Sequence, residues 1–140
     1  MDSYGFRHGT RMLVKLPVDS ATSDITAGDI LTWGSPGYVQ QAAAGSNTVA
    51  GVAFDSVASP SSDGDVSILV DISESSVYAY PPDSGTVTLA LAGTTMDLGG
   101  ARSIDIDAST DGVVRVVGTD VDNNLVFVTF KTVTSYAGVV

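Results

Sequence analysis

The aspartates are the residues of this chain best suited to chemistry, and several of them gather in short loop motifs. Asp83-Ser84-Gly85 matches the D-[ST]-G triplet that carries the catalytic carboxylate of aspartic proteases. That chemistry needs two carboxylates that share a proton. Here Pro81-Pro82 stand where an apolar strand should precede the triplet, and the second carboxylate would have to come from another copy of the chain. We interpret the triplet as an ordinary turn and keep a dimeric hydrolase using Asp83 as the weakest functional hypothesis.

Cation binding is the second chemistry that the aspartates suggest. Asp120, Asp122 and Asn124 have the spacing that begins a calcium loop, but Leu125 and Lys131 stand where an EF-hand needs Gly and Glu. Other loop carboxylates leave a calcium site of a different kind open, namely Asp105 with Asp107 and Asp111, or Asp63 with Asp65. Turn formation is the commoner role of such residues, so no metal site is predicted.

Few other catalytic parts are present in the sequence. His8 is the single histidine and there is no cysteine, so a zinc site or a Ser-His-Asp arrangement lacks members. Glu74, the only glutamate, stands in a serine-rich turn. No glycine-rich phosphate loop occurs. The sequence therefore predicts a protein that is not an enzyme and uses no cofactor.

The elements that carry these loops are expected to be strands. Twenty valines and fourteen threonines stand against one glutamate and two lysines, and β-branched residues favour pleated sheets over helices. The runs 48–54 and 66–72 flank a loop of Asp, Ser, Pro and Gly, and in the second run apolar residues alternate. Alternation with a period of two predicts a half-buried strand, so these runs are expected to form a hairpin-like unit.

Further strands are expected wherever short apolar runs lie between turn signals. The run 11–18 should lie at a sheet edge, because Pro17 cannot donate to a ladder. The run 125–131 is apolar on both faces and should lie near the centre of the packing. The remaining expected strands are 30–33, 38–42, 76–80, 86–92, 94–98, 103–107 and 113–117. The prediction is an all-β fold, a small sandwich or barrel-like domain.

Four segments are predicted along the chain of 140 residues. Residues 1–12 form an extended N-terminal arm, 13–80 a first β lobe, 81–132 a second β lobe packed on the first, and 133–140 a C-terminal tail. The boundary between the lobes is placed at Pro81-Pro82, the strongest break in the sequence.

The charge is distributed unevenly between the arm and the body. The net charge is −10, with 15 acidic and three basic residues in 19–140 against one acidic and three basic residues in 1–18. An acidic body repels phosphates, so nucleic acid is not an expected partner. No apolar run approaches the roughly 20 residues of a membrane span, so no membrane partner is expected either.

The arm is the predicted partner-binding segment. Its candidate contact residues are Tyr4, Phe6, Arg7, Arg11 and Leu13. Aromatic residues and arginine are enriched at protein–protein interfaces, whereas a frayed terminus is the alternative fate of such a segment.

Three short motifs resemble capsid cement, or head decoration, proteins of tailed bacteriophages. They are Ile25-Thr26-Ala27-Gly28-Asp29-Ile30, Val49-Ala50-Gly51-Val52-Ala53 and Asp63-Gly64-Asp65-Val66-Ser67-Ile68-Leu69-Val70. The resemblance covers about residues 20–80 and brings no catalytic residues with it. It implies a small β-rich protein made in the host cytoplasm that binds the outer surface of an expanded shell on the virion. It further implies the major capsid protein as partner and a homo-oligomer, with a trimer favoured and a dimer as the alternative.

The functional expectation is therefore structural. The chain is expected to stabilise a capsid shell through protein–protein contacts. The alternative is a carbohydrate- or cell-surface-binding β-sandwich of a phage fibre or adhesin, in which Trp33 or Tyr38 would stack on sugar.

Overall fold

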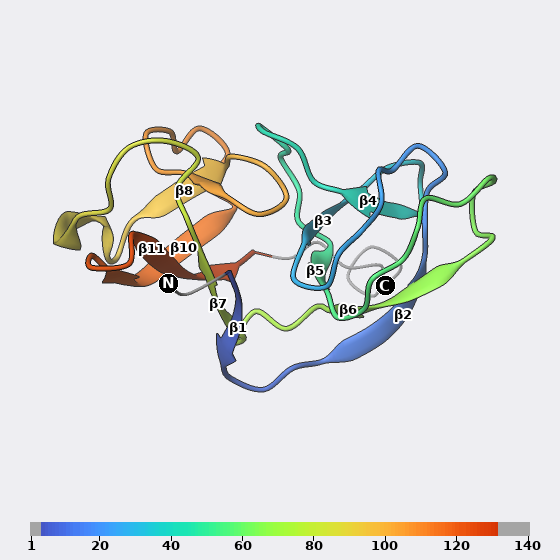
Figure 1. Cartoon of the computed structure of the whole chain (residues 1–140), viewed down its shortest axis with the longest axis horizontal. Helices are drawn as coiled ribbons and strands as arrows, with labels where there is room; N and C mark the ends of the chain where they lie inside the picture. Colours follow the sequence, from blue (N-terminus) through green and yellow to red (C-terminus); the bar gives the residue numbers. More distant parts are fainter. Residues whose placement is uncertain (1–3, 132–140) are drawn as a thin grey trace.

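Short β-branched runs, separated by Gly, Pro and Asp turns, build two antiparallel sheets in this protein (Figure 1). The computed structural model describes residues 4–131. Within them the sheets pack together as a small β-sandwich, which confirms the predicted fold class. The predicted C-terminal tail, 133–140, lies outside the described residues.

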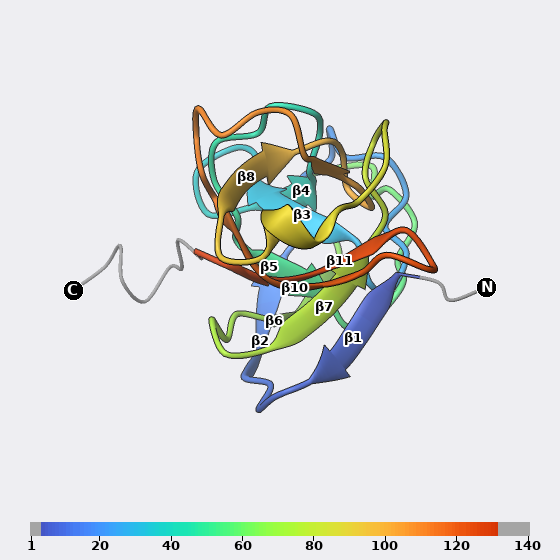
Figure 2. The ribbon, with the colours of Figure 1, turned by 90° about the vertical axis from the view of Figure 1, so that its left-hand side faces the viewer.

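One sheet has six strands and lies on the left of Figure 1. In spatial order the strands are β1 (Gly5–His8), β7 (Val77–Tyr80), β11 (Leu125–Phe130), β10 (Val114–Asp120), β8 (Thr95–Leu98) and β9 (Ile104–Asp105). In Figure 2 the strands β1, β7, β11 and β10 lie side by side. The predicted central position of the run 125–131 is confirmed, because β11 lies between β7 and β10.

The other sheet has five strands. Their order is β2 (Leu13–Pro17), β6 (Ser67–Asp71), β5 (Gly51–Ala53), β3 (Ile30–Trp33) and β4 (Val39–Gln41). The predicted hairpin-like unit is confirmed, since β5 pairs with β6 in antiparallel fashion. The predicted edge position is also confirmed, because β2 with Pro17 forms one border of this sheet.

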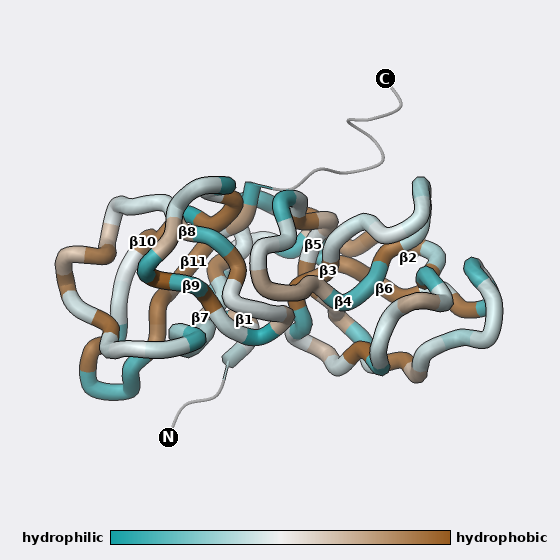
Figure 3. Tube along the Cα trace, turned by 90° about the horizontal axis from the view of Figure 1, so that it is seen from above, coloured by the Kyte–Doolittle hydropathy of each residue, from teal (hydrophilic) through white to brown (hydrophobic). Residues whose placement is uncertain are grey.

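Two apolar clusters hold the sheets. The first lies between them and joins Ile30 and Val52 of the five-stranded sheet to Tyr80, Val126 and Phe130 of the six-stranded sheet. The second covers the opposite face of the five-stranded sheet, beneath the loops that precede β3 and β6. Figure 3 shows hydrophobic stretches in both sheets, among more hydrophilic loops.

In addition to the apolar cluster, an ion pair and hydrogen bonds join the two sheets. The buried Asp29 carboxylate, just before β3, pairs with the Arg102 guanidinium from the turn between β8 and β9. The Tyr80 hydroxyl donates to the Gly28 carbonyl oxygen at 2.7 Å. The Ile30 amide donates to the Ala101 carbonyl oxygen at 2.8 Å. These bonds fix how one sheet sits on the other.

The sheets do not divide the chain where the sequence suggested. The predicted boundary at Pro81-Pro82 follows β7, yet β7 already belongs to the six-stranded sheet. The chain changes sheets earlier, in the turn between β6 and β7. The N-terminal segment also belongs to the six-stranded sheet, because β1 pairs with β7.

The predicted strand 86–92 is wrong. Leu89–Leu91 form a 3₁₀ turn instead (η1), and the Leu89 side chain is 76% exposed. Gly85 and Gly93 flank the segment with positive φ angles, so the chain turns at both ends. The Val87 amide donates to the Asn124 side chain at 2.7 Å rather than to a neighbouring strand.

No helix within residues 4–131 has the length and apolar character to cross a membrane.

Candidate functional site

The N-terminal segment is held to the body by its aromatic residues. The Tyr4 ring stacks on Tyr80 with ring centroids 5.9 Å apart, and Phe6 meets the Tyr78 ring edge-on at 5.6 Å. Both Tyr4 and Phe6 are half-buried. Offset and edge-on pairs stabilise by about 0.5–1.5 kcal/mol beyond their burial. These two predicted contact residues therefore anchor the segment to its own sheet.

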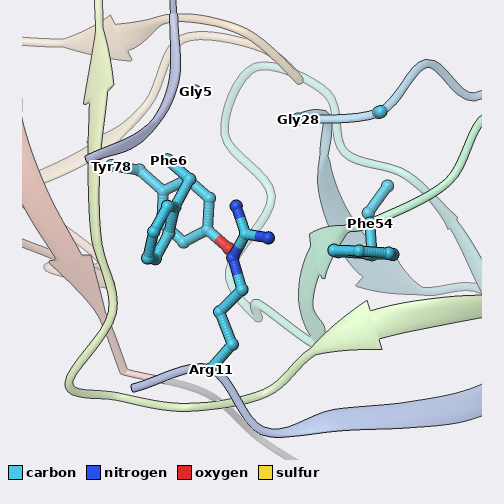
Figure 4. A pocket seen from close by; sticks show the side chains of 8 residues that line it. Gly5, Phe6, Arg11, Gly28, Phe54 and Tyr78 are labelled. Atoms are coloured by element: carbon cyan, nitrogen blue, oxygen red, sulfur yellow. The ribbon is translucent and has the colours of Figure 1, made fainter. Parts of the chain in front are cut away.

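Arg11 occupies the space between the sheets beyond this anchor (Figure 4). Its guanidinium carbon lies 3.7 Å from the centroid of the Phe6 ring and 5.2 Å from that of Phe54. Cation–π contacts of this kind are worth about 0.5–1 kcal/mol at exposed sites. Stacking uses the face of the guanidinium, and the Tyr78 hydroxyl lies beside its N–H edge (Figure 4).

A buried carboxylate supports the wall behind Arg11. Asp71 is 3% exposed and accepts hydrogen bonds from the Tyr78 hydroxyl at 2.6 Å and from the amides of Met12 and Ser73, both at 3.0 Å. Desolvation first, and then the bond to Asp71, raise the pKa of Tyr78 well above its ordinary value, while Arg11 opposes this shift. Tyr78 therefore stays protonated and keeps its hydroxyl on Asp71.

A cavity of about 210 Å³ opens beside the guanidinium. Its walls come from both sheets: Phe6, Arg11 and Tyr78 on one side and Gly28, Ala53 and Phe54 on the other (Figure 4). Gly28 has no side chain and exposes its backbone to the cavity, and Ala53 belongs to the second apolar cluster on the other face of the sheet. Gly28 has a φ of +95°, and an added Cβ there would lie 2.7 Å from the Tyr4 ring.

A mixed basic and apolar surface continues from this cavity across the five-stranded sheet. Antiparallel pairing places Leu13 opposite Asp71 and Lys15 opposite Leu69, and the Phe54 amide donates to the Leu69 carbonyl oxygen. Residues at alternate positions share a face of a strand, so these side chains lie on one face. We call it the basic–apolar face, and it consists of Arg11, Leu13, Lys15, Phe54 and Leu69.

Exposure distinguishes this face from an ordinary sheet surface. Phe54 is 41% exposed and Leu13 39%. Within residues 4–131, neither Arg11 nor Lys15 forms an ion pair with a carboxylate, whereas Arg102 pairs with Asp29 and Arg115 with Glu74. Large apolar groups beside unpaired cations are suited to a protein partner.

Arg7 lies apart from the other predicted contact residues. It lines, with His8, a second hollow of about 290 Å³ over Val77, Val117 and Phe127 of the six-stranded sheet. The five predicted residues therefore divide into three groups. Tyr4 and Phe6 serve as anchors, Arg11 and Leu13 belong to the basic–apolar face, and Arg7 faces the second hollow.

Three of the aspartates singled out for chemistry accept backbone hydrogen bonds within or between loops. The carboxylates of Asp105, Asp120 and Asp63 accept the amides of Asp107, Asn123 and Ser20 respectively. Among the residues that the structure describes, no three His, Cys, Asp or Glu side chains gather as a metal site.

The remaining candidates also have structural settings. Asp83 of the D-[ST]-G triplet is exposed. Glu74 pairs with Arg115 at 2.8 Å. Trp33, the candidate for sugar stacking, packs half-buried against the second apolar cluster, and Tyr38 is half-buried.

Sequence reasoning missed Lys15, Phe54 and Leu69 as members of the face. Leu69 carried a signal, because it alone interrupts the polar side of the alternating run 66–72. Leu69 lies opposite Lys15 and is part of the basic–apolar face.

No protein-family profile matches the chain, and neither the curated proteins nor the solved structures include a significant match to it.

Proposed function

We propose that this chain is a structural decoration protein that binds the outer surface of a bacteriophage capsid shell and stabilises it. The observation that carries the proposal is the basic–apolar face, which two sheets and a pinned N-terminal segment hold in place. A binding surface built on strands needs little ordering when the partner arrives, so less affinity is lost to entropy.

Charge supports this orientation of the protein on a shell. Residues 19–140 carry a net charge of −12, while Arg11 and Lys15 bring positive charge to one face. An acidic partner would be repelled from most of the molecule and attracted at that face. Many copies on one lattice would add avidity to each weak contact. The phage assignment itself comes from the three motifs within residues 20–80.

The test is decoration of mature shells built from the major capsid protein encoded in the same genome, observed by electron microscopy and co-sedimentation. Leu13→Ser should reduce occupancy, because it removes an apolar side chain from the face. Val121→Ser is the matched control, since Val121 is 43% exposed and lies on the turn between β10 and β11, away from the face. Equal occupancy of the shells by both variants would show that the basic–apolar face does not bind the shell.

A further inference from the structure

The cavity beside Arg11 has the size and chemistry of a receptor for one side chain. Its volume of about 210 Å³ is below the roughly 300–1,000 Å³ typical of small-molecule sites. Apolar rings flank it, and a single cation projects into it (Figure 4). An anchor residue of a protein partner fits this description better than a cofactor does.

The only charge at the cavity comes from Arg11, among the side chains that line it. Asp71, which accepts the hydroxyl of the cavity-lining Tyr78, is engaged by three donors and forms no ion pair with Arg11. The Phe6 ring covers one face of the guanidinium and fixes its plane. The Tyr78 hydroxyl lies beside the guanidinium, and the terminal nitrogens point away from that hydroxyl (Figure 4). A carboxylate matches two parallel N–H groups in that plane.

We propose that the cavity receives an acidic side chain, glutamate or aspartate, from the shell protein, with its carboxylate on the Arg11 guanidinium. An apolar neighbour of that residue packs on Phe54, which lines the cavity, and on Leu13 of the same face. Lys15, on the same face, adds a second positive charge farther from the cavity. This inference rests on the proposed function for the identity of the partner, and it adds the chemistry that the partner must present.

The shell experiment uses charge reversal in the full chain. Arg11→Glu should weaken shell binding by about 30-fold or more, as expected when one member of a desolvated charge pair is removed. Lys131→Glu reverses an exposed charge just after β11 and should leave the affinity unchanged. Arg11→Lys keeps the charge but loses the planar fork, so intermediate binding is expected. Urea unfolding of each variant ensures that only folded protein is compared.

Shell binding by Arg11→Glu equal to that of wild type would overturn the inference and leave the proposed function standing. A change in the solution mass of the protein on Arg11→Glu would also overturn it, because the face would then be an interface between copies of this chain. Absence of wild-type decoration at saturating concentration would overturn the proposed function and the shell as the partner.

A second experiment tests the cavity without shells. Acetyl-Glu-Leu-amide is titrated into the isotopically labelled full chain, with acetyl-Gln-Leu-amide as the uncharged control. The glutamate probe should shift the Arg11 Nε–H and Phe54 signals and bind about tenfold more tightly than the glutamine probe. The preference should disappear in Arg11→Gln and as salt is raised. Equal shifts from both probes would overturn the assignment of the cavity to a carboxylate, whatever the shells show.

Discussion

Replacing Arg102 with alanine should weaken the junction between the two sheets. The Asp29 side chain is fully buried and pairs with the Arg102 guanidinium, which is 45% exposed. Its carboxylate also accepts the Thr26 amide and the Gln41 side-chain amide, both at 2.9 Å. Arg102→Ala removes the positive partner and leaves the buried negative charge with these two neutral donors.

The loss in unfolding free energy on Arg102→Ala depends on how well water can replace the guanidinium beside Asp29. Breaking a fully buried ion pair by removing one partner costs about 3–5 kcal/mol. Because nearly half of the Arg102 side chain is exposed, water can enter beside Asp29, and we expect a loss of about 2–3 kcal/mol. Arg102→Lys should lose about 1 kcal/mol, since the charge remains but the paired N–H groups do not.

Urea unfolding of wild type and variants measures these differences, with the dependence on urea held constant as evidence of two-state behaviour. Arg115→Ala is the matched control, because Arg115 and Glu74 are 39% and 51% exposed and such pairs contribute about 0–1 kcal/mol. A loss below about 0.5 kcal/mol for Arg102→Ala would show that the pair does not hold the sheets together.

Three further predictions concern the body of the protein. Gly51→Ala should destabilise it by about 2 kcal/mol or more, because Gly51 has a φ of +156° and an added Cβ would collide with the Asp71 carbonyl oxygen; thermal unfolding checks this. The amides of Ser35 and Ala21 lower the pKa of Asp19 from its ordinary value of 3.8, so the stability that this carboxylate adds should be present above pH 3.8 and lost as the pH falls through the lowered pKa. The difference in unfolding free energy between wild type and Asp19→Asn should therefore shrink in acid, and a difference independent of pH would contradict the assignment. Trp33→Ala should change stability and not glycan binding, because Trp33 packs against the second apolar cluster; a glycan array in calcium on which wild type binds and the variant does not would favour the carbohydrate alternative.

The strands could be predicted where burial on one face imposes alternation. Ile68, Val70 and Ile72 fall on one side of the run 66–72, and all three lie in the second apolar cluster. The same pattern failed at 86–92, where Val87 is buried but Leu89 is not. Alternation marks side-chain direction only when a partner strand is present, and here local turn bonds satisfy the backbone instead.

The candidate site was predicted in part. The residue types of the N-terminal segment indicated contact, and Arg11 and Leu13 lie on the basic–apolar face. Nothing in the local sequence indicates that Tyr4 and Phe6 stack on Tyr80 and Tyr78, more than 70 residues away. Phe54 joins Arg11 through the order of strands β2, β6 and β5, and sheet order is a non-local property.

The most direct test of the central claim is the occupancy of mature shells by the wild-type protein, measured by cryo-electron microscopy after mixing the two at saturating protein concentration. Regular density is expected on the outer surface of the shell, with the basic–apolar face toward the capsid subunits and Arg11 beside an acidic side chain. Shells without added density would contradict the proposed function. Density with this face turned to solvent would contradict the assigned surface.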